Sequence, residues 1–176
     1  NLLRWSYSES KAIDESLAFS YFQEFNLPIR IVRFFNTVGP GQVGRYGMVV
    51  PRFIDSALKN LPIEIYGDGT QTRCFAHVED VIEGLVKVAF SEKTLGIALN
   101  IGNDEEISIL DLAKKVIQIS NSNSQITFKS YDEAYGRNFE DMIRRVPDLS
   151  LIKSLIGWTP KKSITDIIQD VIKDRN

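Results

Sequence analysis

Apolar side chains recur along this chain at two spacings, one typical of amphipathic helices and the other of short buried strands. Helical spacing predicts helices at residues 7–25, 49–60, 78–90, 108–120, 148–158 and 163–174. Short runs rich in β-branched and aromatic residues predict strands at residues 29–35, 97–102 and 125–130, and two more around the Gly-Asp-Gly turn within 63–78. Helices that alternate with strands are typical of an α/β fold.

Several predicted elements carry signals that fix where they begin or end. Pro28 stops the first helix, and Pro51 lies in the first turn of the second, where its missing N–H costs nothing. Paired side chains three residues apart are expected to cap three helices: Asp80 with Glu83, Ser108 with Asp111, and Ser163 with Asp166. We therefore interpret Asp80 as a helix cap rather than a catalytic acid, and we expect Trp158 to lie in the core.

The composition of the chain mainly excludes some kinds of binding partner. With 176 residues and 43% hydrophobic side chains, the chain is long enough for one core, or for a core with a small additional lobe. Its 21 basic and 23 acidic residues give a net charge of -2, so no strong field attracts nucleic acid or an anionic membrane. Any bound anion must be held by a few placed Arg or Lys residues.

The chain has one cysteine, Cys74, and one histidine, His77. A single cysteine excludes an intrachain disulfide and a cysteine-based zinc cluster, and it favours a cytoplasmic, reducing location. No third ligand or acid partner accompanies the two residues in the sequence. We therefore expect both to pack within one strand rather than to act as a nucleophile or as metal ligands.

Tyr7 and Lys11 stand four residues apart in the first predicted helix, so they share one face about one turn apart. A phenol titrates near about 10 and is a poor base at neutral pH unless a nearby cation stabilises the phenolate. The pair is either a catalytic tyrosine with an activating lysine or an ordinary exposed helix pair. The rest of the sequence has to decide between these two interpretations.

Four stretches resemble one known family in their order and spacing. They are YSESK at 7–11, RFFNTVGPGQVGRYGMVVPRFI at 33–54, YGDGTQTRCFAHVEDV at 66–81 and RRVPDLSLIKSLIGW at 144–158. Together they resemble the extended short-chain dehydrogenase/reductases, specifically the NAD-dependent nucleotide-sugar epimerases, dehydratases and UDP-glucuronate decarboxylases. The resemblance runs through nearly the whole chain.

The resemblance implies the C-terminal part of a Rossmann-type α/β fold together with a small mixed α/β substrate-binding lobe. Residues 1–36 and 66–100 would belong to the NAD-binding domain, and residues 37–65 and 101–176 to the lobe. In the family, a Gly-rich pyrophosphate turn and a catalytic Ser or Thr precede the Tyr-x-x-x-Lys helix, and neither occurs here. The chain, which begins at Asn1, therefore resembles the C-terminal half of such an enzyme.

The same resemblance implies roles for the tyrosine and the lysine. Tyr7 would be the general base that takes the proton from the sugar C4 hydroxyl while hydride passes to the nicotinamide. Lys11 would supply the charge that favours the phenolate and would bond the nicotinamide ribose. The implied cofactor is NAD, although its main binding loop is absent from this chain.

A first group of residues is implied to contact the nucleotide sugar from the long loop after the 29–35 strand. Asn36 lies at the carboxyl end of that strand, where α/β proteins place ligand contacts, although Asn also suits a turn. Met48 and Val49 would pass the nucleotide base with backbone and apolar contacts. Arg52 belongs to the same segment, and it is interpreted equally well as a contact of the nucleotide or as a residue of the helix surface.

A second group is implied to hold the base and the diphosphate. Tyr66 would pack against the uracil or thymine ring, although an aromatic at a strand end also packs in a core. Arg73 is the strongest anion ligand, because a planar guanidinium suits a diphosphate, and Gln71 would assist it. Arg145 would bind the diphosphate or, in the decarboxylases, the sugar carboxylate. Arg144 would be its exposed neighbour, and a shift of one residue in the register would exchange the two roles.

These residues imply a reaction that begins by oxidising C4 of a UDP-hexose or UDP-hexuronate. The leading interpretation is an enzyme like UDP-glucose 4-epimerase, with UDP-glucuronate decarboxylase and dTDP-glucose 4,6-dehydratase as alternatives. A different class of function also stays open, because catalysis needs NAD held against Tyr7. We expect the isolated chain to be inactive and to act only as a nucleotide-sugar-binding or association module.

The resemblance also implies a homodimer that packs through the Tyr-x-x-x-Lys helix and the helix before it. Because that preceding helix is absent, the face that carries Leu17, Tyr21 and Phe25 should be partly exposed, and the chain should self-associate. We expect the partners to be a nucleotide sugar and a second copy of the chain, with no nucleic acid and no membrane.

Overall fold

The computed structural model describes residues 6–44, 48–135 and 142–175. Its helices are α1 (Ser6–Phe25), α2 (Val49–Leu58), α3 (Val78–Phe90), α4 (Ile109–Ser120), α5 (Tyr131–Tyr135), α6 (Ser150–Ile156) and α7 (Ile164–Arg175), with a 3₁₀ turn at Glu92–Thr94. Its strands are β1 (Ile31–Phe34), β2 (Thr37–Val38), β3 (Ile63–Tyr66), β4 (Thr72–Cys74), β5 (Ala76–His77), β6 (Ala98–Ile101), β7 (Glu106–Ser108), β8 (Ile126–Lys129) and β9 (Arg144–Arg145).

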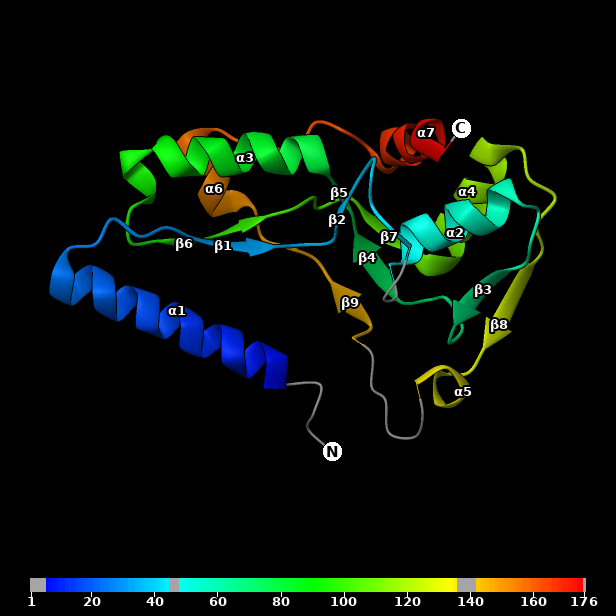
Figure 1. Ribbon diagram of the computed structural model, residues 1–176, viewed down its shortest axis with the longest axis horizontal. Coiled ribbons are helices and arrows are strands. Elements are labelled where there is room, and N and C mark those ends of the chain that lie inside the picture. The colour runs from blue at the N-terminus through cyan, green and yellow to red at the C-terminus, as the bar shows by residue number, and fades with distance from the viewer. Residues whose placement is uncertain (1–5, 45–47, 136–141, 176) are drawn as a thin grey trace.

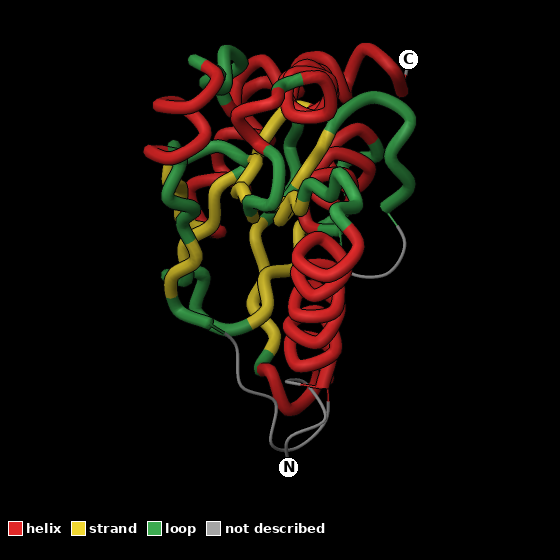
Figure 2. Tube along the Cα trace, turned by 90° about the vertical axis from the view of Figure 1, so that its left-hand side faces the viewer, coloured by secondary structure: helices red, strands yellow, loops and turns green. Residues whose placement is uncertain are grey.

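The strands form several small sheets in which most pairs are parallel. β1 pairs with β6, β2 with β5, and β3 with β8, all in parallel register, while β4 lies between antiparallel β7 and parallel β9. The β1–β6 pair lies between α1 on one side and α3 with α6 on the other (Figure 1). In the side view, helices gather above the strands and α1 runs alongside them (Figure 2). Parallel strands connected through helices confirm the predicted α/β class.

Two clusters of buried side chains hold this arrangement together. The larger lies among α2, α4, α7 and β3, and includes Phe53, Ile54, Ile63, Ile65, Leu112, Val116, Ile167 and Ile168. The smaller lies beneath α3 and α6, and includes Val81, Val88, Leu99, Ile101, Ile152 and Trp158. The predicted core position of Trp158 is confirmed, since its side chain is 1% exposed.

The helix boundaries agree closely with the predictions, and two of the three capping pairs are confirmed. The Ser108 hydroxyl accepts from the backbone N–H of Asp111 at 3.0 Å, and Ser163 accepts in the same way from Asp166 at 3.3 Å.

Among the described helices, none is both long and apolar enough to cross a bilayer.

The prediction that Asp80 caps α3 is wrong. The cap is His77, whose Nδ1 accepts from the backbone N–H of Glu79 at 3.1 Å. Asp80 lies inside the helix, and its carboxylate accepts the backbone N–H groups of Lys161 and Lys162, both at 2.9 Å. A buried carboxylate needs such partners, so Asp80 joins α3 to the segment before α7 instead of starting its own helix.

Candidate functional site

Two hollows on the surface collect all the residues that the sequence marked for chemistry. The first, which we call the α2 pocket, is a cavity of about 210 Å³ between α2, β3, β4 and the segment after β1. It is lined by six of the predicted residues: Asn36, Met48, Val49, Tyr66, Gln71 and Arg73. The second, the α1 pocket, is a wider hollow of about 1020 Å³ beside α1 and β1, and its lining includes Tyr7, Lys11 and Arg145.

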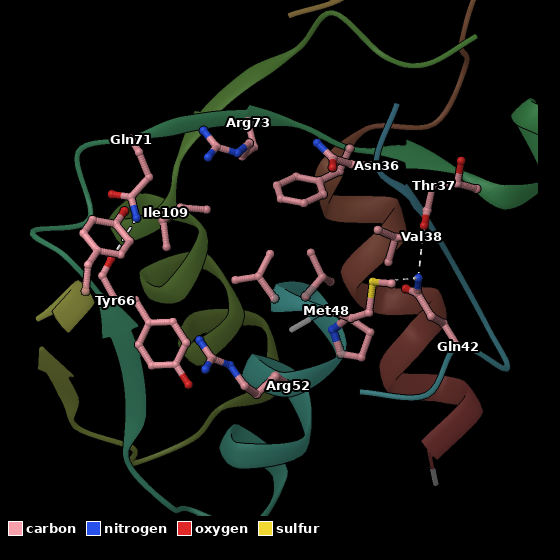
Figure 3. Close-up of a pocket in the computed structure, with 15 residues that line it drawn as sticks. Asn36, Thr37, Val38, Gln42, Met48, Arg52, Tyr66, Gln71, Arg73 and Ile109 are labelled. Atoms are coloured by element: carbon pink, nitrogen blue, oxygen red, sulfur yellow. Dashed lines mark hydrogen bonds between the residues drawn. The ribbon is translucent and has the colours of Figure 1, made fainter. Parts of the chain in front are cut away.

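Hydrogen bonds to the backbone hold several side chains of the α2 pocket in place. The Asn36 amide donates to the carbonyl of Cys74 at 2.8 Å, which fixes it between β2 and β4. The Gln71 amide donates to the Tyr66 carbonyl, also at 2.8 Å, across the turn that follows β3. Figure 3 shows Tyr66 on one side of the pocket and Met48 on the opposite side, with Arg73 at its upper edge. Polar and aromatic side chains thus converge on one cavity, as a binding site for a small ligand requires.

Two backbone carbonyls orient the Arg73 guanidinium in the α2 pocket. Its Nη1 donates to the carbonyls of Thr72 at 2.7 Å and Met142 at 2.8 Å. The β4–β9 ladder places Arg145 directly beside it, as its partner in the register. Two like charges on neighbouring strand positions repel each other, and an anion bound between them would relieve that repulsion. The arrangement therefore suits a ligand that carries phosphate or carboxylate groups.

Arg145 faces the α1 pocket, whereas Arg144 does not take part in either pocket. The Arg145 guanidinium carbon lies 5.2 Å from the centre of the Phe35 ring, a distance typical of a cation–π contact. Arg144 is exposed and forms an ion pair with Glu106, at 3.0 Å from Nη2 to Oε2. The interpretation of Arg144 as the exposed neighbour is confirmed. Arg73 and Arg145 are therefore register neighbours that line different pockets.

Tyr7 and Lys11 share one face of α1, as their spacing predicts. The Lys11 Nζ lies 5.9 Å from the centre of the Tyr7 ring and 2.7 Å from the Asp14 carboxylate. The hydrogen bond that the Lys11 ammonium donates to the Asp14 carboxylate raises the pKa of Lys11, which keeps it charged. Tyr7 is 71% exposed, so the described residues place its phenol in water rather than in an enclosed site. An enclosed reaction site would need further groups over this face.

An ion pair that the sequence gave no reason to expect ties α1 to β1. The Arg33 guanidinium donates to both carboxylate oxygens of Glu15, at 2.7 and 2.6 Å. This contact lowers the pKa of the Glu15 carboxyl. Glu15 lies one turn beyond Lys11 and two turns beyond Tyr7 on the same stripe of the helix. The pair therefore holds the stripe that carries Tyr7 and Lys11 against the sheet.

Sequence reasoning missed several residues that line the α2 pocket, among them Gln42 and Tyr131. Gln42 is anchored through its amide, which donates to the Thr37 carbonyl at 3.1 Å. Tyr131 follows β8 and reaches the pocket because β8 pairs with β3. A Cβ on Gly67 would lie 2.7 Å from the Tyr131 ring, so the turn after β3 requires glycine there. No local pattern reveals this neighbour, because the β3–β8 pairing is long-range.

Cys74 and His77 do not form a reactive centre. Both are buried, at 1% and 0% exposure, although they belong to consecutive strands rather than to one. Burial raises the pKa of the Cys74 thiol to about 11, which leaves almost no thiolate at neutral pH. His77 acts as the helix cap described above, and its Nε2 lies 3.3 Å from Asp170. Within the described part of the chain, no three side chains are grouped to hold a metal ion.

Comparisons with known proteins identify the family to which the chain belongs. Residues 3–171 match the family model described as GDP-mannose 4,6 dehydratase. A UDP-N-acetyl-alpha-D-glucosaminuronate decarboxylase from Bacillus cytotoxicus is 37% identical over 172 residues, which cover 97% of this chain and 53% of the relative. UDP-glucuronic acid decarboxylase 2 from Arabidopsis thaliana is 37% identical over 172 residues, which cover 98% of this chain and 37% of that protein.

A solved structure extends the comparison to three dimensions. The UDP-glucuronic acid 4-epimerase from Bacillus cereus, in complex with UDP-glucuronic acid and NAD, matches with a TM-score of 0.78 at 31% identity, over 91% of this chain and 49% of that one. The chain belongs to the extended short-chain dehydrogenase/reductase family of nucleotide-sugar epimerases and dehydratases. It spans about half the length, or less, of these relatives.

Proposed function

We propose that this chain forms the nucleotide-sugar-binding half of an NAD-dependent enzyme that oxidises C4 of a UDP-sugar. The observation that carries the proposal is the α2 pocket, where Asn36, Tyr66, Gln71 and Arg73 meet around one cavity. Tyr66 supplies an aromatic face for the base and Arg73 a guanidinium for the diphosphate. Met48 and Val49 line the same cavity from the start of α2 and contact the nucleotide.

We further propose that the sugar is a hexuronate. All three relatives compared above are named for UDP-linked uronates, two as decarboxylases and one as a 4-epimerase. A uronate carries a carboxylate in addition to the two phosphates of UDP. Arg145 is the register neighbour of Arg73, so it supplies a second cation that can bind this carboxylate. Epimerisation and decarboxylation both begin with the same oxidation at C4. The two decarboxylases among these relatives make decarboxylation as well supported as epimerisation.

The α1 pocket fits the nicotinamide side of NAD. The pocket combines the Lys11 ammonium and the Tyr7 phenol with the apolar side chains of Ile31, Phe34 and Phe35. When bound, NAD supplies the acceptor for the hydride that leaves C4. Tyr7 would take the proton from the C4 hydroxyl, and the Lys11 ammonium, on the same face of α1, would hold the ribose. The Glu15–Arg33 pair keeps this stripe of α1 in place.

Calorimetric titration of the chain with UDP-glucuronic acid, UDP-glucose and NAD tests the proposal. We expect UDP-glucuronic acid to bind more tightly than UDP-glucose, because of its additional carboxylate, and NAD to bind weakly. We also expect no turnover by the chain alone, because the described α1 pocket leaves Tyr7 in water. Failure of both UDP-sugars to bind would contradict the proposal. Tight NAD binding would contradict the expectation that this chain holds the nucleotide sugar but lacks most of the NAD site.

We also propose that α1 pairs with a second copy of the chain. α1 has no buried side chain, and its exposed apolar residues include Ile13, Leu17, Tyr21 and Phe25. A row of exposed apolar side chains of this kind marks an interaction surface. Sedimentation at rising concentration should show a dimer, and Leu17→Glu should shift it towards monomer. Phe90→Glu, on α3 across the sheet, is the matched control and should leave the dimer intact.

A further inference from the structure

Arg52 makes an unusual set of contacts on the wall of the α2 pocket. Its guanidinium carbon lies 4.2 Å from the centre of the Tyr66 ring and 5.5 Å from that of Phe53. Its Nη2 donates to the carbonyl of Glu64 at 3.0 Å. These contacts join α2, which carries Arg52, to β3, which carries Tyr66. Figure 3 shows the Arg52 side chain extended towards the Tyr66 ring.

The Arg52 side chain gives up part of its hydrogen bonding to make this stack. Its Nε is buried, and it has no hydrogen-bond partner in the structure as described. A buried N–H without a partner is unfavourable, and a guanidinium on a helix surface could keep all its donors in water. Of the two interpretations that the sequence left open for Arg52, these contacts favour a residue of the pocket wall. The contact with Tyr66 and the hydrogen bond to the Glu64 carbonyl together keep the side chain in the pocket wall.

Tyr66 is thereby held at two points. The Gln71 amide fixes its backbone carbonyl at 2.8 Å, and Arg52 covers one face of its ring. A planar base that packs against Tyr66 must use the opposite face, and a fixed ring loses less freedom when it is stacked. We propose that Arg52 is a positioning residue that sets the plane of Tyr66 for stacking with the nucleobase of the ligand. This inference rests on the proposed binding of a UDP-sugar.

A comparison of two ligands isolates this role in the 176-residue chain. UDP carries the base together with the diphosphate, whereas inorganic pyrophosphate carries only the charge. In Arg52→Met and Arg52→Lys, we expect the Kd of UDP to rise by about tenfold, because stacking of one base is worth that much. The Kd of pyrophosphate should change by less than about twofold, because Arg73 remains in place. Retained pyrophosphate binding also shows that the variants are folded.

Arg144→Met is the matched control, because Arg144 is exposed and lies outside both pockets. It removes the same charge and should leave both constants unchanged. Equal weakening of UDP and pyrophosphate in the Arg52 variants would overturn the inference, since it would assign Arg52 to general charge or folding. Unchanged UDP binding would overturn it too. A parent chain that binds pyrophosphate but not UDP would overturn the proposed function itself, and this inference with it.

Discussion

Arg73→Gln should weaken the binding of UDP-glucuronic acid by about a hundredfold. Each hydrogen bond to a charged group contributes about 1.5–3 kcal/mol, and about 1.4 kcal/mol corresponds to a factor of ten in affinity. The wild-type guanidinium is already oriented by the carbonyls of Thr72 and Met142, so it loses little freedom when an anion binds. Calorimetric titration of the variant and the parent chain measures the change directly.

Two further variants sharpen this test. Arg73→Lys keeps the positive charge but loses the planar fork, so it should recover only part of the lost affinity. Arg144→Gln removes a positive charge that is exposed and paired with Glu106, and that lies beside Thr72 rather than beside Arg73 in the strand register. Its affinity should stay within about twofold of the parent chain. A similar loss in Arg144→Gln would mean that the whole surface charge, rather than Arg73, attracts the ligand.

Local patterns predict most of the fold because the signals lie within single elements. The helical spacing of apolar residues places α1, α3 and α4 within a residue or two, and the Ser108–Asp111 pair marks where α4 begins. His77 shows the limit of this reasoning. An imidazole is an uncommon helix cap, so the pattern favours Asp80, whereas the structure uses the Asp80 carboxylate for a distant segment.

Site residues that belong to family motifs can be predicted from the sequence, whereas those that depend on tertiary contacts cannot. Arg73 and Tyr66 belong to motifs that can be read in the sequence, and both line the α2 pocket. Arg52 depends on how α2 meets β3, Tyr131 on how β3 meets β8, and the Glu15–Arg33 pair on how α1 meets β1. Such neighbours are separated by many residues, so no periodicity or spacing reports them.

Trp158→Ala should lower the free energy of unfolding by about 3–5 kcal/mol. The side chain is 1% exposed and packs in the smaller cluster with Val81, Leu99 and Ile152. Its Nε1 donates to the Asp80 carbonyl at 3.1 Å, and a Cβ on Gly84 would come within 2.8 Å of its ring. Removal of the indole leaves a cavity between α3 and the sheet that these rigid neighbours can only partly fill. Urea unfolding followed by circular dichroism measures the loss.

The smaller cluster also supports the α1 pocket. Leu99 and Ile101 of this cluster lie on β6, and β6 pairs with β1, whose residues line that pocket. In Figure 1 the β1–β6 pair lies between α1 and α3. Trp158→Phe keeps a ring but loses the hydrogen bond, so it should cost less than the alanine variant. Phe90→Ala is the matched control on α3, where the ring is 84% exposed, and it should change stability by less than about 0.5 kcal/mol. If Trp158→Ala cost no more than this control, the smaller cluster would not be what holds α3 on the sheet.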